Sequence, residues 1–169
     1  MNDLKGIGLI ADSNVMIDYL QCDSTLISLI NNHLAQLYLP TPLLGEVEEI
    51  TEDGCIQLGI KLIEPELEQI IQASQERGAL SFQDNLCLIL AKENGWTLVT
   101  NDKALRRRCE EEGTPIKWGI ELICILVESG GLSRERAKII ILKIQEINPR
   151  FITDNIVEDA FKRLNLKGK

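Results

Sequence analysis

A short apolar run near the start of the chain, residues 7–14 (IGLIADSN), ends abruptly at the carboxylate of Asp12. An apolar run of this length, bounded by polar residues, is typical of a buried strand in a parallel sheet. In open α/β sheets, ligands bind beyond the carboxyl ends of the strands. We therefore expect Asp12 to lie at the sheet edge where such folds have their functional sites.

Four later segments have the same apolar character, and segments with helix-forming signals separate them. The predicted helices begin at capping residues or proline, as at Thr41-Pro42 and Ser81, and end at glycine, as at Gly95 and Gly113. Strands that alternate with helices form parallel sheets covered on both faces. The sequence therefore predicts an α/β fold with strands within residues 7–14, 36–42, 58–64, 96–100 and 114–118.

The last 50 residues have a different pattern. Three helical segments follow one another without a strand, at residues 119–130, 133–147 and 153–166. The second carries an apolar stripe between 139 and 147 that is wider than one helix face needs, so it either covers the α/β body within the chain or forms a homodimer surface. We expect residues 119–169 to be a helical extension packed on a domain of residues 1–118, as one compact unit.

Composition narrows the classes of protein to consider. Hydrophobic residues make up 44% of the chain but aromatic residues only 4%, which predicts an aliphatic core. No segment approaches the roughly 18 to 20 apolar residues that cross a bilayer, and the first residues lack a signal-type segment, so we expect a cytoplasmic protein without a membrane partner. Five scattered cysteines and a single histidine, His33, argue against a disulfide framework and against a zinc site.

The charges are distributed unevenly along the chain. Residues 1–100 contain 15 acidic and 4 basic residues, whereas residues 101–169 contain 11 acidic and 14 basic residues, within a net charge of −8. This balance excludes a uniformly basic nucleic-acid-binding protein. It is compatible with a bipolar molecule that has an acidic half and a mildly basic half.

Four carboxylates occur at places that parallel strands bring together. Asp12 and Asp102 directly follow predicted strands. Asp84 lies in the first turn of the helix before the fourth strand, and Glu46 follows the second strand. Carboxylates that crowd together repel one another unless a cation shares the site, and oxygen donors without histidine or thiolate suit Mg²⁺ or Mn²⁺. Such ions support phosphodiester displacement.

Each of these carboxylates also has a structural explanation. Asp12 and Asp102 could simply cap the helices that follow them, and Asp84 stands three residues after Ser81, as in a capping box. We expect a helix over residues 41–50, on which Glu46 and Glu49 share a face, so either could complete the cluster. Taken together, and with two members at strand ends, the set favours a functional site.

Three segments resemble the PIN-domain family, which includes the VapC-like toxin ribonucleases. They are IADSNVMIDYL, PLLGEVEEI and, most specifically, LSFQDNLCLILAKENGWTLVTNDKALR, within residues 7–118. The resemblance implies an α/β/α sandwich with strand order 3-2-1-4-5 and a Mg²⁺- or Mn²⁺-dependent ribonuclease, often a toxin paired with a small antitoxin-type protein. The final helices resemble a PIN-like group with a C-terminal helical extension.

The resemblance also implies roles for individual residues. It places Asp12, Glu46, Asp84 and Asp102 in the catalytic cluster. Our hypothesis is that Asp12, Asp84 and Asp102 bind the metal and that hydrogen-bonding neighbours support them, namely Ser13, Asn14, Ser81 and Asn101. The nearest candidates for holding the RNA substrate are Lys103, Arg106 and Arg107, although a solvated helix paired with Glu110, Glu111 and Glu112 explains the same charges.

Two other functions remain open from the sequence. A phosphoryl-accepting receiver or a phosphatase would also gather Asp residues around Mg²⁺, but the third strand ends in Glu64 and the D-x-D motif of the phosphatases is interrupted by Asn14. The second of these other functions is that of a non-catalytic PIN-like module whose acidic groove only binds a partner. The sequence specifies neither the RNA target nor the number of metal ions.

Overall fold

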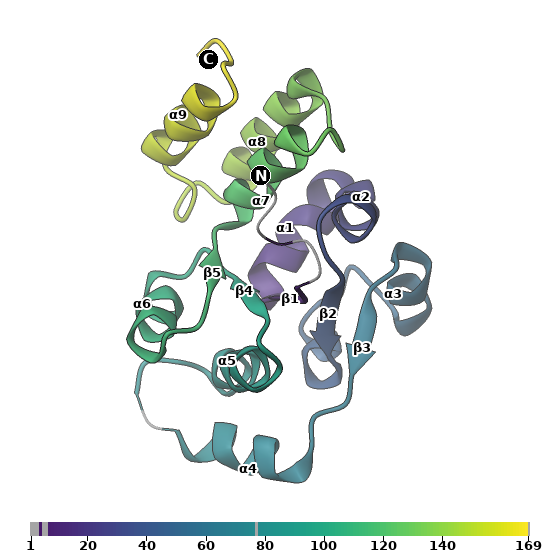
Figure 1. The fold of residues 1–169 in the computed structure, drawn as a ribbon, viewed down its shortest axis with the longest axis vertical. Helices are drawn as coiled ribbons and strands as arrows, with labels where there is room; N and C mark the ends of the chain where they lie inside the picture. Colours follow the sequence, from purple (N-terminus) through teal and green to yellow (C-terminus); the bar gives the residue numbers. More distant parts are fainter. Residues whose placement is uncertain (1–3, 5–6, 77, 169) are drawn as a thin grey trace.

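The computed structural model describes residues 4, 7–76 and 78–168. Over these residues it contains one five-stranded sheet, nine α-helices and one 3₁₀ helix (Figure 1). All strand pairs are parallel, and the order is β3-β2-β1-β4-β5, so the predicted α/β class and strand order are confirmed. The strands are β1 Leu9–Ala11, β2 Leu37–Pro40, β3 Lys61–Ile63, β4 Thr97–Val99 and β5 Ile116–Lys117.

The central position of β1 decides which strand ends meet. Leu9 pairs with Leu37 of β2 on one side and with Thr97 of β4 on the other. Beyond the ladder, the backbone N–H of Asp12 donates to the carbonyl of Val99 at 3.1 Å. The carboxyl ends of β1 and β4 are therefore neighbours. This order also differs from the 2-1-3-4-5 sheet of receiver domains, which removes the receiver as an alternative.

Among the helices that separate the strands, α5 begins at Ser81, and α5 and α6 end at the glycines that the sequence indicates. The Ser81 hydroxyl accepts from the N–H of Asp84 at the start of α5, and Gly95 and Gly113 end α5 and α6 in the left-handed conformation, at φ 68° and 70°. These helices are α1 Ser13–Asp23, α2 Thr25–His33, α4 Leu67–Gln75, α5 Phe82–Asn94 and α6 Lys103–Glu112.

The helix expected over residues 41–50 is wrong. A 3₁₀ helix, η1 (Thr41–Gly45), ends at the glycine, and a separate helix, α3 (Glu52–Leu58), follows. The side chain of Thr51 accepts from the N–H of Gly54, so Gly54 lies inside a capped first turn instead of ending a helix. Glu46 consequently lies outside any helix.

The core is mainly aliphatic, as predicted, with Tyr19 and Phe161 as buried aromatic members, and an aromatic pair lies at the amino end of β1. Trp96 stacks on Tyr38 of β2, with ring centroids 4.0 Å apart. A Cβ atom at Gly8 would lie 2.3 Å from the Trp96 ring, so only glycine allows this approach. Trp96 thus belongs to the packing of the sheet, at the end opposite the carboxyl edge.

The three C-terminal helices lie together at one end of the molecule, opposite α4 (Figure 1). They are α7 Gly119–Glu128, α8 Arg134–Ile147 and α9 Asp154–Arg163. Helix α8 packs on α1, and α7 packs on α2. Ile140, Ile141 and Ile144 are buried there, so much of the apolar stripe is covered within the chain, whereas Ile139 and Ile147 remain 67% and 42% exposed. The domain boundary at residue 118 stays a prediction.

Two polar contacts also join α1 to this extension. The Tyr19 hydroxyl donates to the carbonyl of Gly119 at 2.6 Å, and the Asn148 amide donates to Asp18 at 3.2 Å. Asp18 is buried, and this burial raises the pKa of its carboxyl to about 6, against the lowering effect of the Asn148 hydrogen bond. Among the described helices, none is long and apolar enough to cross a membrane.

Candidate functional site

Four carboxylates from four separate segments line one cleft at the carboxyl edge of β1 and β4. We call them the acidic cluster: Asp12, Glu46, Asp84 and Asp102. The cleft has a volume of about 450 Å³. Its other lining residues are Ser13, Asn14, Ile17, Ser81 and Gln83. All four predicted carboxylates therefore face the same space, together with three of the four predicted supporting residues.

Asp12 is the most buried member of the cluster. It follows β1 and caps α1, where its Oδ1 accepts from the N–H of Val15 at 2.9 Å and its Oδ2 accepts from the Thr100 hydroxyl. Burial raises the pKa of Asp12 to about 7; the two hydrogen bonds oppose this rise, and the charges of Asp84 and Asp102 add to it. None of the described residues that line the cleft is basic, so no side chain there offsets the negative charges around Asp12.

Asp84 and Asp102 cap helices and face the cleft at the same time. Asp102 precedes α6, and its Oδ1 accepts from the N–H of Leu105 at 2.9 Å. Asp84 Oδ2 accepts from the N–H of Ser81 at 3.3 Å in a capping box. Burial, with the charges of Asp102 and Glu46, raises the pKa of Asp84 despite the hydrogen bonds from Ser81. The structural explanation is thus correct, and both carboxylates line the cleft as well.

Glu46 and Glu49 lie at different positions relative to the cleft. Glu46 Oε2 accepts from the Ser13 hydroxyl at 2.9 Å, which ties it to the start of α1 beside Asp12. Glu49 instead accepts from Gln21 Nε2 at 3.0 Å, and only Glu46 of the two lines the cleft. The expectation that both share a helix face is wrong, because Glu46 follows η1 in a turn.

Thr100 is the residue of the site that the sequence reasoning missed. Its hydroxyl donates to Asp12 Oδ2 and accepts from the N–H of Asp102 at 3.0 Å, and the residue is fully buried. One side chain thus connects two members of the acidic cluster. The signal was available, because a hydroxyl residue at the end of the fourth strand must lie beside Asp12 once β1 and β4 are neighbours.

Asn101 has a different environment from the one predicted. Its Oδ1 accepts from the N–H of Gly119 at 3.0 Å, and its side chain is absent from the lining of the cleft. Its hydrogen bond therefore joins the β4–α6 connection to the start of α7. Asn14, by contrast, is exposed and lines the cleft beside Ser13.

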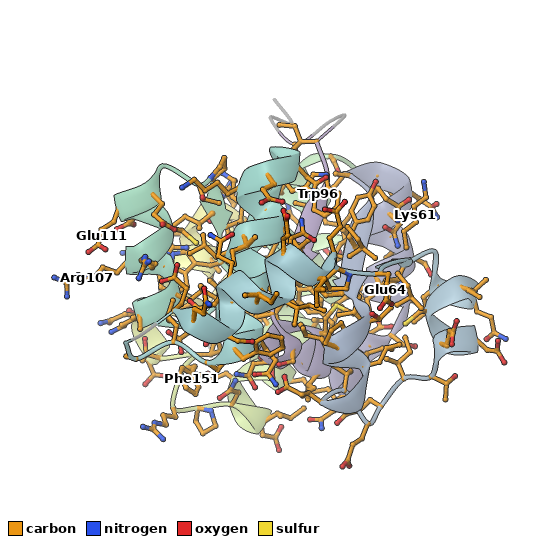
Figure 2. The ribbon with its side chains drawn as sticks, turned by 90° about the horizontal axis from the view of Figure 1, so that it is seen from below. Lys61, Glu64, Trp96, Arg107, Glu111 and Phe151 are labelled. Atoms are coloured by element: carbon orange, nitrogen blue, oxygen red, sulfur yellow. The ribbon has the colours of Figure 1, made fainter. Side chains whose placement is uncertain are left out.

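The basic residues of α6 differ in how far their charges are already paired. Arg107 contacts Glu111 at 3.6 Å, and Figure 2 shows both side chains projecting outward together. Arg108 contacts Glu76 at 3.2 Å. Lys103 is exposed at the first position of the helix, and Arg106 lies over the ring of Trp118. The predicted surface pairing therefore applies to Arg107, and its role in RNA binding stays a prediction.

The donor set suits a hard divalent cation in its chemistry. It consists of carboxylate oxygens, and backbone N–H groups and a hydroxyl donate hydrogen bonds to these carboxylates. Metal ligands in proteins are commonly oriented by hydrogen bonds of this kind. In the part of the chain that the structure describes, however, no three His, Cys, Asp or Glu side chains are close enough as placed to ligate one ion. Ligation by three carboxylates would therefore require rotation of cluster side chains toward one another.

Comparison with known proteins identifies the fold. No protein-family model matches the sequence, and no curated protein matches it. A similar solved structure is the PilT N-terminus domain protein SSO1118 from the hyperthermophilic archaeon Sulfolobus solfataricus P2, with a TM-score of 0.53 and 13% identity. The similarity covers 73% of this chain and 93% of that chain. Together with the strand order, it shows that the chain has a PIN-like fold, the PilT N-terminus fold.

Proposed function

We propose that this protein is a metal-dependent endoribonuclease that hydrolyses phosphodiester bonds in single-stranded RNA. The observation that carries the proposal is the acidic cluster, in which four carboxylates from separate segments line one cleft at the carboxyl edge of the sheet. Burial and, to a smaller extent, the neighbouring carboxylates raise the pKa values of Asp12 and Asp84. A divalent cation would favour their ionised forms.

In the proposed site, Asp12, Asp84 and Asp102 would hold Mg²⁺ or Mn²⁺. The bound ion would activate water and offset the charge that develops on the phosphate oxygens. Thr100 fixes the orientation of the Asp12 carboxylate through its hydroxyl. The capping bonds from Leu105 and Ser81 do the same for Asp102 and Asp84.

Glu46 is suited to handle the proton of the attacking water. It is exposed, so solvent reaches it, and the Ser13 hydroxyl holds Oε2 while Oε1 faces no donor among the described residues. A carboxylate held in this way can orient a water molecule and accept its proton at Oε1. The RNA backbone would be held by Lys103, which is exposed directly after Asp102 at the start of α6.

The biological role that fits this activity is that of a VapC-like toxin, restrained by a small antitoxin-type protein. If the protein is such a toxin, we expect induced synthesis of the wild-type chain to arrest the growth of a bacterial host. Synthesis of Asp12→Asn at the same level should not arrest growth. Equal growth with both chains would contradict the toxin role and leave the nuclease proposal to be tested in vitro.

The direct test is cleavage of a fluorescent single-stranded RNA by the purified protein. We expect Mg²⁺ or Mn²⁺ to be required, EDTA to stop the reaction, and Asp12→Asn to be inactive. Circular dichroism and the melting temperature would establish that the variant is folded. Equal cleavage by wild type and Asp12→Asn would overturn the assignment, as would a folded wild-type protein that cuts no RNA and serves only as a binding module.

A further inference from the structure

A second cleft lies next to the acidic cluster, between α6, α7 and α9. We call it the Trp118 cleft; its volume is about 340 Å³. Its apolar wall includes Trp118, Ile120 and Ile156, and its charged groups are Arg106, Glu121, Asp159 and Arg163. A cleft with one aromatic ring, aliphatic walls and a few charged groups has the character of a small-ligand site.

Arg106 is the central charged group of this cleft. Its guanidinium carbon lies 3.6 Å from the centroid of the Trp118 ring, a close cation–π contact. Its Nη1 is buried and makes no hydrogen bond within the described residues. Burial lowers the pKa of Arg106, against the effect of Glu121. A buried N–H donor without a partner is unfavourable, so a rotation of the guanidinium that turns Nη1 into the cleft, toward an acceptor of a ligand, would stabilise it.

The other charges of the Trp118 cleft divide into paired and unpaired groups. Arg163 contacts Glu128 at 2.6 Å and Glu121 at 3.8 Å. Glu121 also contacts Lys117 and accepts from the N–H of Trp118. Asp159, on α9, is exposed and has no hydrogen bond or ion pair to a described residue. The cleft therefore presents one free donor group, Arg106, and one free acceptor group, Asp159.

The two clefts are close enough to serve one extended substrate. Arg106 follows Asp102 by four residues on α6, so it lies on the same side of the helix about 6 Å further along the axis. Trp118 directly precedes Gly119, whose N–H is bonded to Asn101, the neighbour of Asp102. Both clefts thus open near the carboxyl ends of β4 and β5.

We propose that the Trp118 cleft binds one base of the RNA, a guanine, beside the nucleotide that is cut. Single-stranded RNA is read by unstacked bases that pack on aromatic or guanidinium groups and use their edges for hydrogen bonds. Arginine pairs with the O6 and N7 acceptors of guanine, and the N1–H and N2–H₂ donors of the same base suit a carboxylate. Arg106 and Asp159 supply these two groups, so the cleft gives the nuclease its sequence preference. This inference rests on the proposed function.

The test measures RNA binding without cleavage, in EDTA, with the full chain. Trp96→Phe leaves Trp118 as the only tryptophan, so its fluorescence reports on this cleft. The probes are hexauridylate and five-uridine hexamers that carry one guanosine at each position in turn. We expect at least one guanosine-containing hexamer to bind about tenfold more tightly than hexauridylate and to quench Trp118.

Substitutions assign the preference to the two groups. Arg106→Ala should remove the tenfold preference, and Asp159→Asn, at an exposed position that leaves the packing intact, should reduce it several-fold. The matched control is Arg150→Ala, because Arg150 also lies near an aromatic ring, 5.7 Å from the centroid of Phe151, but on the α8–α9 connection. The control should keep the preference.

Two outcomes would overturn the inference: no hexamer is preferred and Trp118 is not quenched, or Asp159→Asn and Arg106→Ala retain the preference of the control. Cleavage in Mg²⁺ is scored separately. A wild-type protein that cuts RNA without guanine preference would leave the proposed function standing and refute the base site. A protein that binds guanosine-containing hexamers but cuts none would refute the nuclease and retain the base site.

Discussion

Helix α1 carries two buried aspartates whose surroundings differ. Asp12 starts the helix and Asp18 lies within it; both are 5% exposed, and burial raises the pKa of both, to about 7 and about 6. Asp12 faces a cleft with three further carboxylates. Asp18 faces the amide of Asn148, which joins α1 to the connection between α8 and α9.

This difference shows that a raised pKa alone does not identify a catalytic group. At Asp18 the shift comes from burial, and a neutral amide is a sufficient partner. At Asp12 the neighbouring charges of Asp84 and Asp102 add to the effect of burial, and the cleft has room for a ligand. Under the proposed function Asp12 would bind the cation, whereas Asp18 contacts the C-terminal extension through Asn148.

The largest expected effect is the difference in RNA cleavage between variants of Asp12 and Asp18. Removing a group that supports a metal ligand costs roughly 10- to 100-fold in metal affinity or activity, so removing a ligand should cost more. We expect Asp12→Asn to lower RNA cleavage by more than about 100-fold and Asp18→Asn to leave it within about twofold of wild type. Initial cleavage rates at saturating Mg²⁺ measure both. A similar loss in the two variants would abolish the distinction.

A smaller effect is expected from the hydroxyl that connects Asp12 with Asp102. Thr100→Val keeps the shape of the side chain but removes both hydrogen bonds, so we expect Mn²⁺ affinity to fall about 10- to 100-fold. Thr114→Val is the matched control, because Thr114 is also buried but its hydroxyl has no partner within the described residues. Calorimetric titration with Mn²⁺ measures the change. Equal affinities would show that Thr100 does not support the site.

The third prediction concerns Asp18 and pH. Its folded pKa, about 6, exceeds its ordinary value of 3.8, so its contribution to stability is fully present below about pH 4 and is lost as the pH rises through 6. Asp18→Asn stays neutral and can still accept from Asn148. Between pH 4 and pH 8, we expect the variant to gain on the order of 2 kcal/mol in unfolding free energy relative to wild type.

Urea denaturation of both proteins at pH 4 and pH 8, without added metal, measures this gain. Asp12 titrates in the same direction in both proteins, so its contribution cancels in the difference. A difference between the two proteins that is the same at both pH values would refute the structural role assigned to Asp18.

The smallest expected effect distinguishes the two glutamates that follow β2. Glu46→Gln removes a carboxylate that lines the cleft but keeps a side chain that can still orient water, so we expect a loss of about tenfold in the cleavage rate, below the roughly 100-fold or more typical of general acid–base groups. Glu49→Gln changes a side chain that contacts Gln21 outside the cleft and should leave the rate unchanged. The two rates, measured in one series, test the assignment. A larger loss in Glu49→Gln would reverse it.

Much of the fold follows from local signals in the sequence. Ser81, Gly95 and Gly113 predict helix ends because capping hydrogen bonds and left-handed turns depend on few neighbouring residues. The failure at residues 41–50 has a local cause. Gly45 ends η1, and the next helix begins only after the capping residue Thr51.

The site was predictable to the extent that strand ends determine it. Asp12, Thr100 and Asp102 follow from the positions of β1 and β4, whereas the contact of Asn101 with Gly119 depends on how the C-terminal extension packs. Asp18 was not singled out, because its burial depends on Asn148, 130 residues away. Long-range packing of this kind leaves no periodic signal in the sequence.

Manganese binding tests the central claim most directly. Titration of the metal-free protein with Mn²⁺ at pH 8, above the pKa of Asp12, should show saturable binding by wild type and by Asp18→Asn. Asp12→Asn, verified to be folded, should bind at least about 100-fold more weakly. Equal Mn²⁺ affinity of Asp12→Asn and wild type, or no saturable binding by the wild-type protein, would contradict the account.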